Sequence, residues 1–256
     1  MIEVVVLGSG SAGNSTLVRR DGRAVLVDAG FSARELKRRL AAVGQPLEGI
    51  EAIVVTHEHG DHVRGLEVFA RACRATIFAT PGTIRCAKSL WELPRLAEIA
   101  ANQPFDAGPF RATPFAIPHD AAQPVGYVLE ADGTRVGYAT DLGHVPASVE
   151  AALDGCAALV FEANHDREML INGPYPWETK QRIGSAYGHL SNDHAAAALP
   201  ALAAEGAAVV LAHLSEKNNN PQLARAAVET ALRAAGRARV RLTLAAQGEP
   251  AAPIRL

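Results

Sequence analysis

The chain has 256 residues, a formal net charge of −2 at pH 7 and 48% hydrophobic residues. This length is enough to bury a full core, and the hydrophobic content excludes wholesale disorder. The near-neutral charge excludes a strongly basic nucleic-acid-binding protein, and aromatic residues at 5% argue against a stacking platform for single strands. The three cysteines form no CxxC pair, so we expect no disulfide framework and a cytoplasmic location.

The periodicity of apolar residues and the turn signals predict strands interleaved with helices along the chain. The predicted strands cover residues 3–7, 15–20, 23–28, 50–55, 76–80, 110–117, 125–130, 135–140, 157–162, 207–211 and 240–245. The predicted helices cover residues 32–43, 63–74, 177–183, 193–204 and 221–235, and a further helix follows Pro81. Ser32 and Glu35 predict a capping box at the start of the first helix, and Gly44 predicts its end.

Strand-rich regions at both ends, with helices interleaved, predict two sheets packed face to face and covered by helices. We therefore expect an α/β protein with a single domain over residues 1–256. The opening residues fit a first strand better than a signal peptide. No window reaches the ~18 consecutive apolar residues of a membrane span, so we expect no membrane contact. The sequence predicts no particular oligomeric state.

The glycine spacing of the first glycine-rich segment matches a dinucleotide-binding fingerprint. Gly8, Gly10 and Gly13 follow a predicted strand, and Asp28 lies 20 residues beyond Gly8. That mechanism requires a helix directly after the glycines, whose N-terminus holds the pyrophosphate. Residues 14–18 predict a strand instead, which argues against dinucleotide binding. The segment is a glycine-rich turn, or a loop whose missing side chains let a substrate approach closely.

The most informative segment is Thr56-His57-Glu58-His59-Gly60-Asp61-His62, which follows a predicted buried strand. His57 and His59 are two residues apart, so they can point to the same side of an extended segment. Four potential ligands within six residues exceed what one tetrahedral site usually takes from so short a span. The segment therefore predicts two metal ions, with His57 and His59 at one and Asp61 and His62 at the other. Imidazole and carboxylate suit Zn²⁺, with Mn²⁺ or Fe as alternatives.

Further ligands must come from distant parts of the chain. His119, Asp141 and His213 each lie at the carboxyl end of an apolar run, the same placement as the histidine-rich segment. A site built from the ends of strands is rigid. This shared placement makes all three residues candidate metal ligands.

The pattern HxHxDH after a strand, followed by a later His, Asp and His, resembles the metallo-β-lactamase superfamily over nearly the whole chain. The resemblance implies an αββα four-layer sandwich with its site at the sheet edges. It assigns the first of two divalent metal ions to His57, His59 and His119, the second to Asp61, His62 and His213, and a bridging position to Asp141. It also matches Asp28 to an early Asp of the superfamily that orients the histidine loop.

Motifs in the second half of the chain narrow the resemblance to the YycJ (WalJ) group. They are Phe161-Glu162-Ala163-Asn164-His165-Asp166, Tyr175-Pro176, Gly188-His189-Leu190-Ser191-Asn192, Ala212-His213-Leu214-Ser215-Glu216 and Asn218-Asn219. Proteins of that group are regarded as metal-dependent DNA exonucleases, so the resemblance implies a nuclease for which DNA is a better substrate than RNA. The glycine-rich opening fits the same group and makes Ser11 and Asn14 candidates for a substrate loop.

Glu162 and His189 lie where the related tRNase Z enzymes carry a Glu and a His that work as a pair. In the implied reaction, two cations activate a bridging hydroxide that attacks phosphorus, and His189, polarised by Glu162, protonates the leaving sugar oxygen. Asp61 belongs to the expected catalytic set as well as to the ligands. His165 has two open interpretations, a position near the metals or a cap of the following helix. Basic residues of this region, Lys180 among them, are candidates for phosphate contacts.

Two other classes of function stay open. A glyoxalase II-like thioesterase or a lactonase shares the HxHxDH ligands, but a thiolate leaving group needs no strong acid. The pair formed by Glu162 and His189 therefore favours a phosphodiesterase. A non-enzymatic metal-binding interaction protein would have a closed coordination sphere, whereas an open, water-bearing site predicts catalysis.

Overall fold

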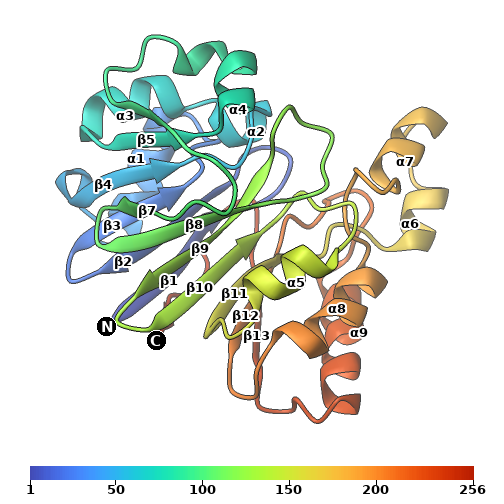
Figure 1. Ribbon diagram of the computed structural model, residues 1–256. Helices are drawn as coiled ribbons and strands as arrows, with labels where there is room; N and C mark the ends of the chain where they lie inside the picture. The colour runs from blue at the N-terminus through green and yellow to red at the C-terminus, as the bar shows by residue number, and fades with distance from the viewer. The chain divides into compact units, whose positions relative to one another are not determined.

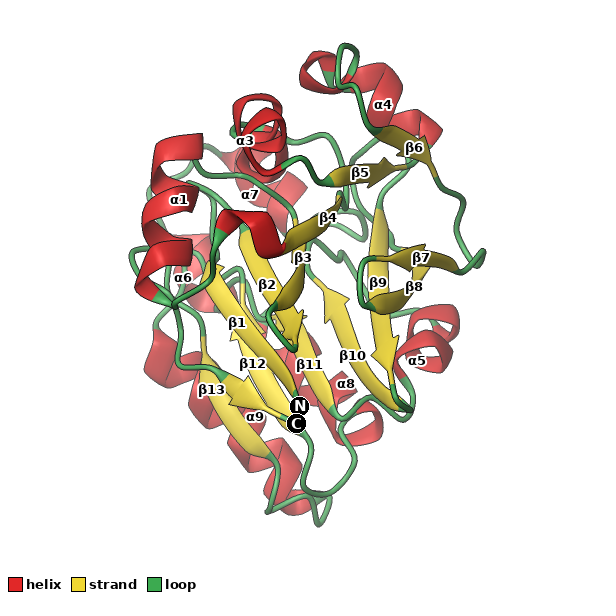
Figure 2. Ribbon diagram, turned by 90° about the vertical axis from the view of Figure 1, so that its left-hand side faces the viewer, coloured by secondary structure: helices red, strands yellow, loops and turns green.

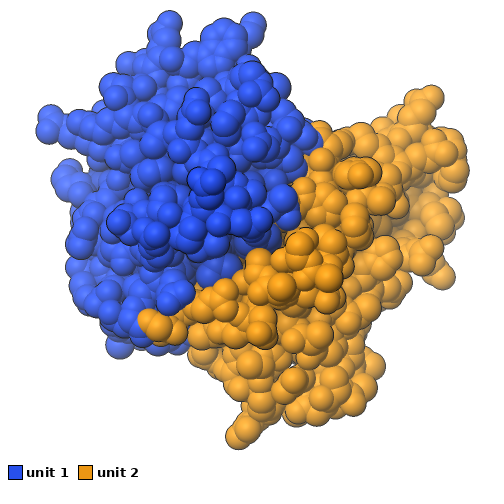
Figure 3. Space-filling model, viewed as in Figure 1, with its two compact units in different colours: residues 1–116, 121–132, 246–256 blue, residues 117–120, 133–245 orange.

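The computed structural model describes residues 1–256 and divides into two compact units (Figure 3). Unit 1 comprises residues 1–116, 121–132 and 246–256, and unit 2 comprises residues 117–120 and 133–245. The expectation of a single domain stays a prediction.

Unit 1 contains a sheet of seven strands in the order β14-β1-β2-β3-β4-β5-β6 (Figures 1 and 2). The strands are β1 (Ile2–Gly8), β2 (Ser15–Arg20), β3 (Arg23–Val27), β4 (Ile50–Val54), β5 (Thr76–Ala79), β6 (Leu96–Glu98) and β14 (Ile254–Arg255). Strands β1, β2 and β3 pair antiparallel, whereas β3, β4, β5 and β6 pair parallel. The carboxyl ends of β3 and β4 therefore meet at one edge of the sheet, where Asp28 and the histidine-rich segment follow them.

The helices of unit 1 are α1 (Ala33–Ala42), α2 (Gly60–Val63), α3 (Leu66–Cys73) and α4 (Pro81–Cys86), with the 3-10 turns η1 (Leu47–Gly49) and η2 (Lys88–Leu90). Ser32 caps α1 as predicted, because its hydroxyl accepts a hydrogen bond from the backbone N–H of Glu35. The carboxylate of Glu35 instead binds the guanidinium groups of Arg38 and Arg39. Of the two bonds of the expected capping box, the structure therefore contains the one made by the Ser32 hydroxyl.

The predicted helix over residues 63–74 is interrupted between α2 and α3. Gly65 lies against the chain near Phe31, where an added Cβ would come within 1.8 Å of the Phe31 carbonyl oxygen. The Gly65 N–H donates to the carbonyl of Ala29 at 2.9 Å. This close approach of two backbone segments sets where α3 begins, and it depends on tertiary contact that helical periodicity does not contain.

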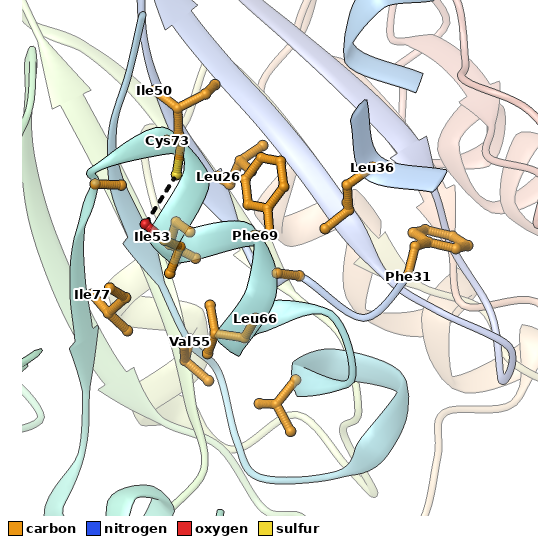
Figure 4. Close-up of a cluster of buried hydrophobic side chains, with 14 of the residues drawn as sticks. Leu26, Phe31, Leu36, Ile50, Ile53, Val55, Leu66, Phe69, Cys73 and Ile77 are labelled. Carbon is orange, nitrogen blue, oxygen red and sulfur yellow. Dashed lines mark hydrogen bonds between the residues drawn. The ribbon is translucent and has the colours of Figure 1, made fainter. Parts of the chain in front are cut away.

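The main core of unit 1 lies between α3 and the sheet (Figure 4). Leu66 and Phe69 of α3 are fully buried and pack in one cluster with Leu26 of β3 and Ile53 of β4. Burial of these side chains supplies the hydrophobic free energy that holds the helix on the sheet. The edge that carries the histidine-rich segment thus rests on a close-packed support.

Unit 1 also contains the antiparallel strands β7 (Phe105–Ala107), β8 (Phe110–Ala116) and β9 (Val125–Ala131). The backbone N–H of Val125 donates to the carbonyl of Thr56 at 3.0 Å, and the hydroxyl of Tyr127 donates to the carbonyl of Val55 at 2.7 Å. Burial raises the pKa of Tyr127 well above its usual value, so the phenol stays a neutral donor. These bonds anchor the start of the histidine-rich segment to β9.

Unit 2 contains four parallel strands, β10 (Thr134–Ala139), β11 (Ala158–Glu162), β12 (Ala208–Ala212) and β13 (Arg241–Leu244). Its helices are α5 (Ala147–Leu153), α6 (Arg167–Asn172), α7 (Trp177–Ile183), α8 (Asn192–Leu202) and α9 (Pro221–Ala234) (Figures 1 and 2). Every residue of β11 and β12 is buried, as the near-continuous apolar runs of these strands predict. Asp141, Glu162 and His213 therefore come together at one edge.

The chain forms two mixed sheets flanked by helices, which confirms the expected α/β class with an αββα sandwich. The helix α5 and the short strands β6, β7 and β14 were not predicted from the sequence, and each has two to seven residues. Elements this short carry too few residues for a period to be recognised. None of the helices combines the length and the apolar character that a bilayer span requires.

The packing of α3 predicts a large difference between two adjacent substitutions. Phe69→Ala empties a fully buried site, and we expect it to lower the free energy of unfolding by about 3–5 kcal/mol. Val68→Ala is the matched control, because Val68 is 65% exposed, and we expect a change within about 0.5 kcal/mol. Denaturant unfolding measures both, and equal losses would contradict the assignment of α3 to the core.

Candidate metal centre

Asp28 organises the histidine-rich segment of unit 1. Its fully buried carboxylate accepts hydrogen bonds from the backbone N–H of Thr56 at 2.8 Å, from the Thr56 hydroxyl at 2.8 Å and from Nδ1 of His62 at 2.7 Å. Burial raises the pKa of Asp28, and the neighbouring His62 and Thr56 oppose that rise. Asp28 therefore holds the first and last parts of the segment in one arrangement.

Hydrogen bonds at Nδ1 select the tautomers of His57 and His62. The Thr56 hydroxyl has one proton, which it gives to Asp28, so Nδ1–H of His57 donates to Thr56 Oγ1 at 3.0 Å. Nδ1–H of His62 donates to Asp28 in the same way. In both imidazoles the Nε2 atom then carries the lone pair that a metal ion requires. The ring centroid of His57 lies 4.1 Å from the ring centroid of His62 and 4.6 Å from that of His59.

Asn14 joins the glycine-rich loop to the histidine-rich segment. Its side-chain oxygen accepts from the hydroxyl of Ser9 and from the N–H of Gly10, both at 2.9 Å. Its amide nitrogen donates to Oδ2 of Asp61 at 3.2 Å and lies 3.1 Å from Nε2 of His62. The loop thus serves to position two predicted ligands, and β2 follows it where a dinucleotide site would need a helix. Ser11 is exposed at the tip of this loop.

Glu162 has the same organising role in unit 2. Its fully buried carboxylate accepts from the backbone N–H groups of Leu142 at 2.9 Å and Leu190 at 3.0 Å. Its other oxygen, Oε1, accepts from Nδ1 of His189 at 2.9 Å and from Nδ1 of His213 at 3.1 Å. Burial opposes the charged form, but the two imidazoles and their hydrogen bonds prevail and hold the pKa of Glu162 well below its usual range.

The bond between Glu162 and His213 was not foreseen from the sequence, which paired Glu162 with His189 alone. It leaves Nε2 of His213 as the ligand atom, 3.5 Å from Oδ1 of Asp141. Asn164 reinforces this orientation, because its amide donates to the carbonyl oxygen of His213 at 2.7 Å. One carboxylate thus orients both a predicted ligand and the predicted proton donor.

His119 and Asp141 complete the set of predicted ligands in unit 2. Nδ1–H of His119 donates to the carbonyl of Gly188 at 3.2 Å, and Nε2 lies 4.0 Å from Oδ1 of Asp141. Burial lowers the pKa of His119, which favours the neutral form that binds metals. Asp141, Glu162, His189 and His213 each offer a ligand atom within 4.8 Å of the others.

Three residues of the site adopt a backbone conformation that is rare outside glycine. The φ angles are 63° for Asp28, 63° for Asp141 and 56° for His213. Each residue follows a strand directly or within two residues. The left-handed conformation therefore turns its side chain away from the strand direction at the edge of the sheet. Such strain costs about 1–3 kcal/mol per residue and clusters at functional sites. No sequence pattern contains this signal.

The Asn218-Asn219 motif supports the loop that follows β11. The Asn219 amide donates to the carbonyls of Ala163 and Asn164, and Asn219 exchanges two hydrogen bonds with Asn192. These bonds fix the backbone beside Asn164, which holds His213.

His165 and Asp166 have different surroundings. Asp166 caps α6 by accepting from the N–H of Met169 at 2.9 Å. His165 is 3% exposed, its Nδ1 atom has no hydrogen-bond partner, and burial lowers its pKa to about 4. Asp166 is therefore the helix cap, whereas His165 is buried and its Nδ1 atom forms no hydrogen bond.

Comparison with known proteins agrees with this geometry. The family model described as Beta-lactamase superfamily domain matches residues 23–214. "Exodeoxyribonuclease YycJ" of Bacillus anthracis is 35% identical over 240 residues, covering 90% of this chain and 89% of that protein. "Ribonuclease Z" of Mycobacterium marinum is 28% identical over 250 residues, covering 82% and 85%. The metallo-β-lactamase fold protein YhfI of Bacillus subtilis superposes with a TM-score of 0.75 at 20% identity, covering 98% of this chain and 100% of that one.

The chain belongs to the metallo-β-lactamase superfamily, and within it to the YycJ/WalJ-like group. Its donor atoms fit the divalent metal ions of that fold. The predicted ligands are imidazole nitrogens and carboxylate oxygens, the set that Zn²⁺, Mn²⁺ and Fe accept. Hydrogen bonds at the far nitrogen orient His57, His62 and His213, as is usual for metal-binding histidines.

The position of Asp28 predicts its effect on metal affinity. Asp28→Asn weakens the orientation of His62 by removing the charged acceptor, and we expect metal affinity to fall about 10–100-fold. Titration against a chromophoric chelator measures the affinity. Asp21→Asn is the matched control, because Asp21 also has a positive φ of 52° but lies exposed in a hairpin turn. Unchanged affinity in Asp28→Asn would refute the orienting role.

Proposed function

We propose that this protein is a metal-dependent nuclease that hydrolyses phosphodiester bonds, with DNA as its substrate. The observation that carries the proposal is the buried Glu162 carboxylate bound to His189 at 2.9 Å, beside Asp141 and His213. A related protein with 35% identity is named an exodeoxyribonuclease, which supports DNA and an exonuclease. The Ribonuclease Z relative, at 28% identity, makes RNA the second candidate substrate.

We propose that the protein binds two divalent metal ions, Zn²⁺ or Mn²⁺ with Fe as an alternative. His57, His59 and His119 would hold the first, Asp61, His62 and His213 the second, and Asp141 would bridge them. This assignment is supported by the family membership of the chain and by the orientation of the imidazoles within each unit. When bound, such ions supply Lewis acidity and lower the pKa of water between them.

His189 is the proposed proton donor to the leaving sugar oxygen. Its Nδ1–H donates to Glu162, so its Nε2–H is the proton that can be transferred. His189 is 13% exposed and lines a cavity of about 490 Å³, so a substrate atom can reach it. A general acid in this position accelerates a reaction about 10²–10⁴-fold.

The two other classes of function are less well supported. A glyoxalase II-like thioesterase or a lactonase would gain little from His189, because its leaving group needs no strong acid. A metal-binding interaction protein would gain nothing from an accessible imidazole held by a buried carboxylate. The three free cysteines and the proposed substrate together support the cytoplasm as the location.

Loss of a proposed ligand tests the metal site. We expect His59→Ala and Asp61→Ala each to abolish DNA hydrolysis while thermal unfolding stays cooperative, because both side chains are partly exposed and outside the core. His144→Ala is the matched control, since His144 is exposed and bonds only to the carbonyl of Ala186. Labelled duplex DNA with Mn²⁺ or Zn²⁺ provides the assay. A ligand variant with full activity would refute its metal role.

Leaving-group dependence tests His189. We expect His189→Ala to lower kcat for DNA about 10²–10⁴-fold but to leave hydrolysis of an activated aryl phosphate ester nearly unchanged, because an aryl oxide leaves without a proton. His144→Ala again serves as the control. Equal losses on both substrates would remove the proton-donor role and leave a structural one.

A further inference from the structure

A cavity of about 490 Å³ lies within unit 2, on the side of His189 that faces α6 and α7. Its lining includes His165, Arg167, Trp177, Lys180, His189 and His194. Figure 1 shows α6 and α7 side by side in this region. The volume is within the range of small-molecule sites, and the lining combines cationic, aromatic and buried polar groups.

The buried polar group is His165. This side chain is 97% buried and lines the cavity, while its Nδ1 atom is covered by the protein and has no hydrogen-bond partner. Most buried polar atoms in folded proteins have a hydrogen-bond partner, so an unpartnered one requires an explanation. His165 therefore adds a buried imidazole to the wall of the cavity.

The cationic groups are Arg167 and Lys180. Arg167 is exposed and forms no ion pair with any carboxylate of unit 2, so its guanidinium is available for a bidentate contact with phosphate. The ammonium of Lys180 donates to the carbonyl of Ile171 at 2.7 Å, which fixes its position and leaves two protons for a ligand. An anion is therefore the ligand class that this side of the cavity favours.

The aromatic group is Trp177, the first residue of α7, which is 64% exposed. Ile171, which is 59% exposed, lines the same cavity. Exposed large apolar side chains gathered beside a cavity indicate a binding surface. An indole is also one of the aromatic side chains on which nucleobases stack.

We propose that this cavity is a nucleotide pocket that receives the terminal nucleotide of the DNA strand, with its phosphate at Arg167 and Lys180 and its base against Trp177. The inference rests on the proposed nuclease function and deepens it. Because His189 lines the same cavity, a nucleotide held there would be adjacent to the bond that is cleaved. The pocket would give the enzyme its preference for strand ends.

Tryptophan fluorescence tests the pocket without relying on catalysis. The chain has two tryptophans, Trp91 and Trp177, so Trp91→Phe leaves Trp177 as the single reporter. The metal-loaded full chain is titrated with a deoxynucleoside 5′-monophosphate, its 3′-monophosphate, the unphosphorylated deoxynucleoside and inorganic phosphate. We expect saturable quenching by at least one monophosphate, and the tighter of the two identifies the end that is bound. Equal binding of the nucleoside, or of phosphate alone, would overturn the proposal.

Substitution in the same background locates the bound phosphate. We expect Arg167→Ala and Lys180→Ala each to raise Kd for the monophosphate about tenfold, the effect of removing a charge-assisted hydrogen bond. Arg241→Ala is the matched control, because Arg241 is exposed on β13 and outside the cavity lining. An unchanged Kd in Arg167→Ala would refute the pocket while DNA hydrolysis by the same protein upholds the nuclease function. Failure of the wild-type chain to hydrolyse DNA would refute the function instead.

Discussion

Two buried carboxylates, one in each unit, determine how the predicted metal ligands are presented. Asp28 accepts hydrogen bonds from His62 and from both donors of Thr56. Glu162 accepts hydrogen bonds from His213, from His189 and from two backbone N–H groups. Each carboxylate is fully buried with all its bonds satisfied, so its imidazole partners have one orientation and one tautomer. The chemistry of the site depends on these bonds because an imidazole that rotates or changes tautomer loses its ligand atom.

The sheet edges explain why such distant residues form a site. Parallel pairing of β3 with β4, and of β10, β11 and β12, brings the segments after those strands to a common edge within each unit. Left-handed backbone at Asp28, Asp141 and His213 then turns the side chains away from the strand direction. The core beneath α3 supports this edge in unit 1, so stability and function rely on the same strands.

Much of this arrangement follows from the sequence because the relevant signals are local. Long apolar runs predicted the strands, and the density of potential ligands in residues 57–62 predicted a metal-binding loop, which stays a prediction. The absence of a helix after Gly13 correctly excluded a dinucleotide fold, since β2 begins at Ser15. Three features could not be predicted: the interruption at Gly65 of the helix expected over residues 63–74, the shared use of Glu162 by two histidines, and the support from Asn219. Each of these depends on contacts between residues far apart in the chain.

The central proposal is that the ligands predicted from the sequence hold one pair of divalent metal ions. Anomalous diffraction from crystals of the Mn²⁺-loaded protein tests it most directly, because the anomalous peaks locate the ions without assumptions about the ligands. The account predicts two peaks about 3.5–4 Å apart, with the carboxylate of Asp141 between them. A single ion bound by residues 57–62 alone, or peaks remote from Asp141, would contradict it.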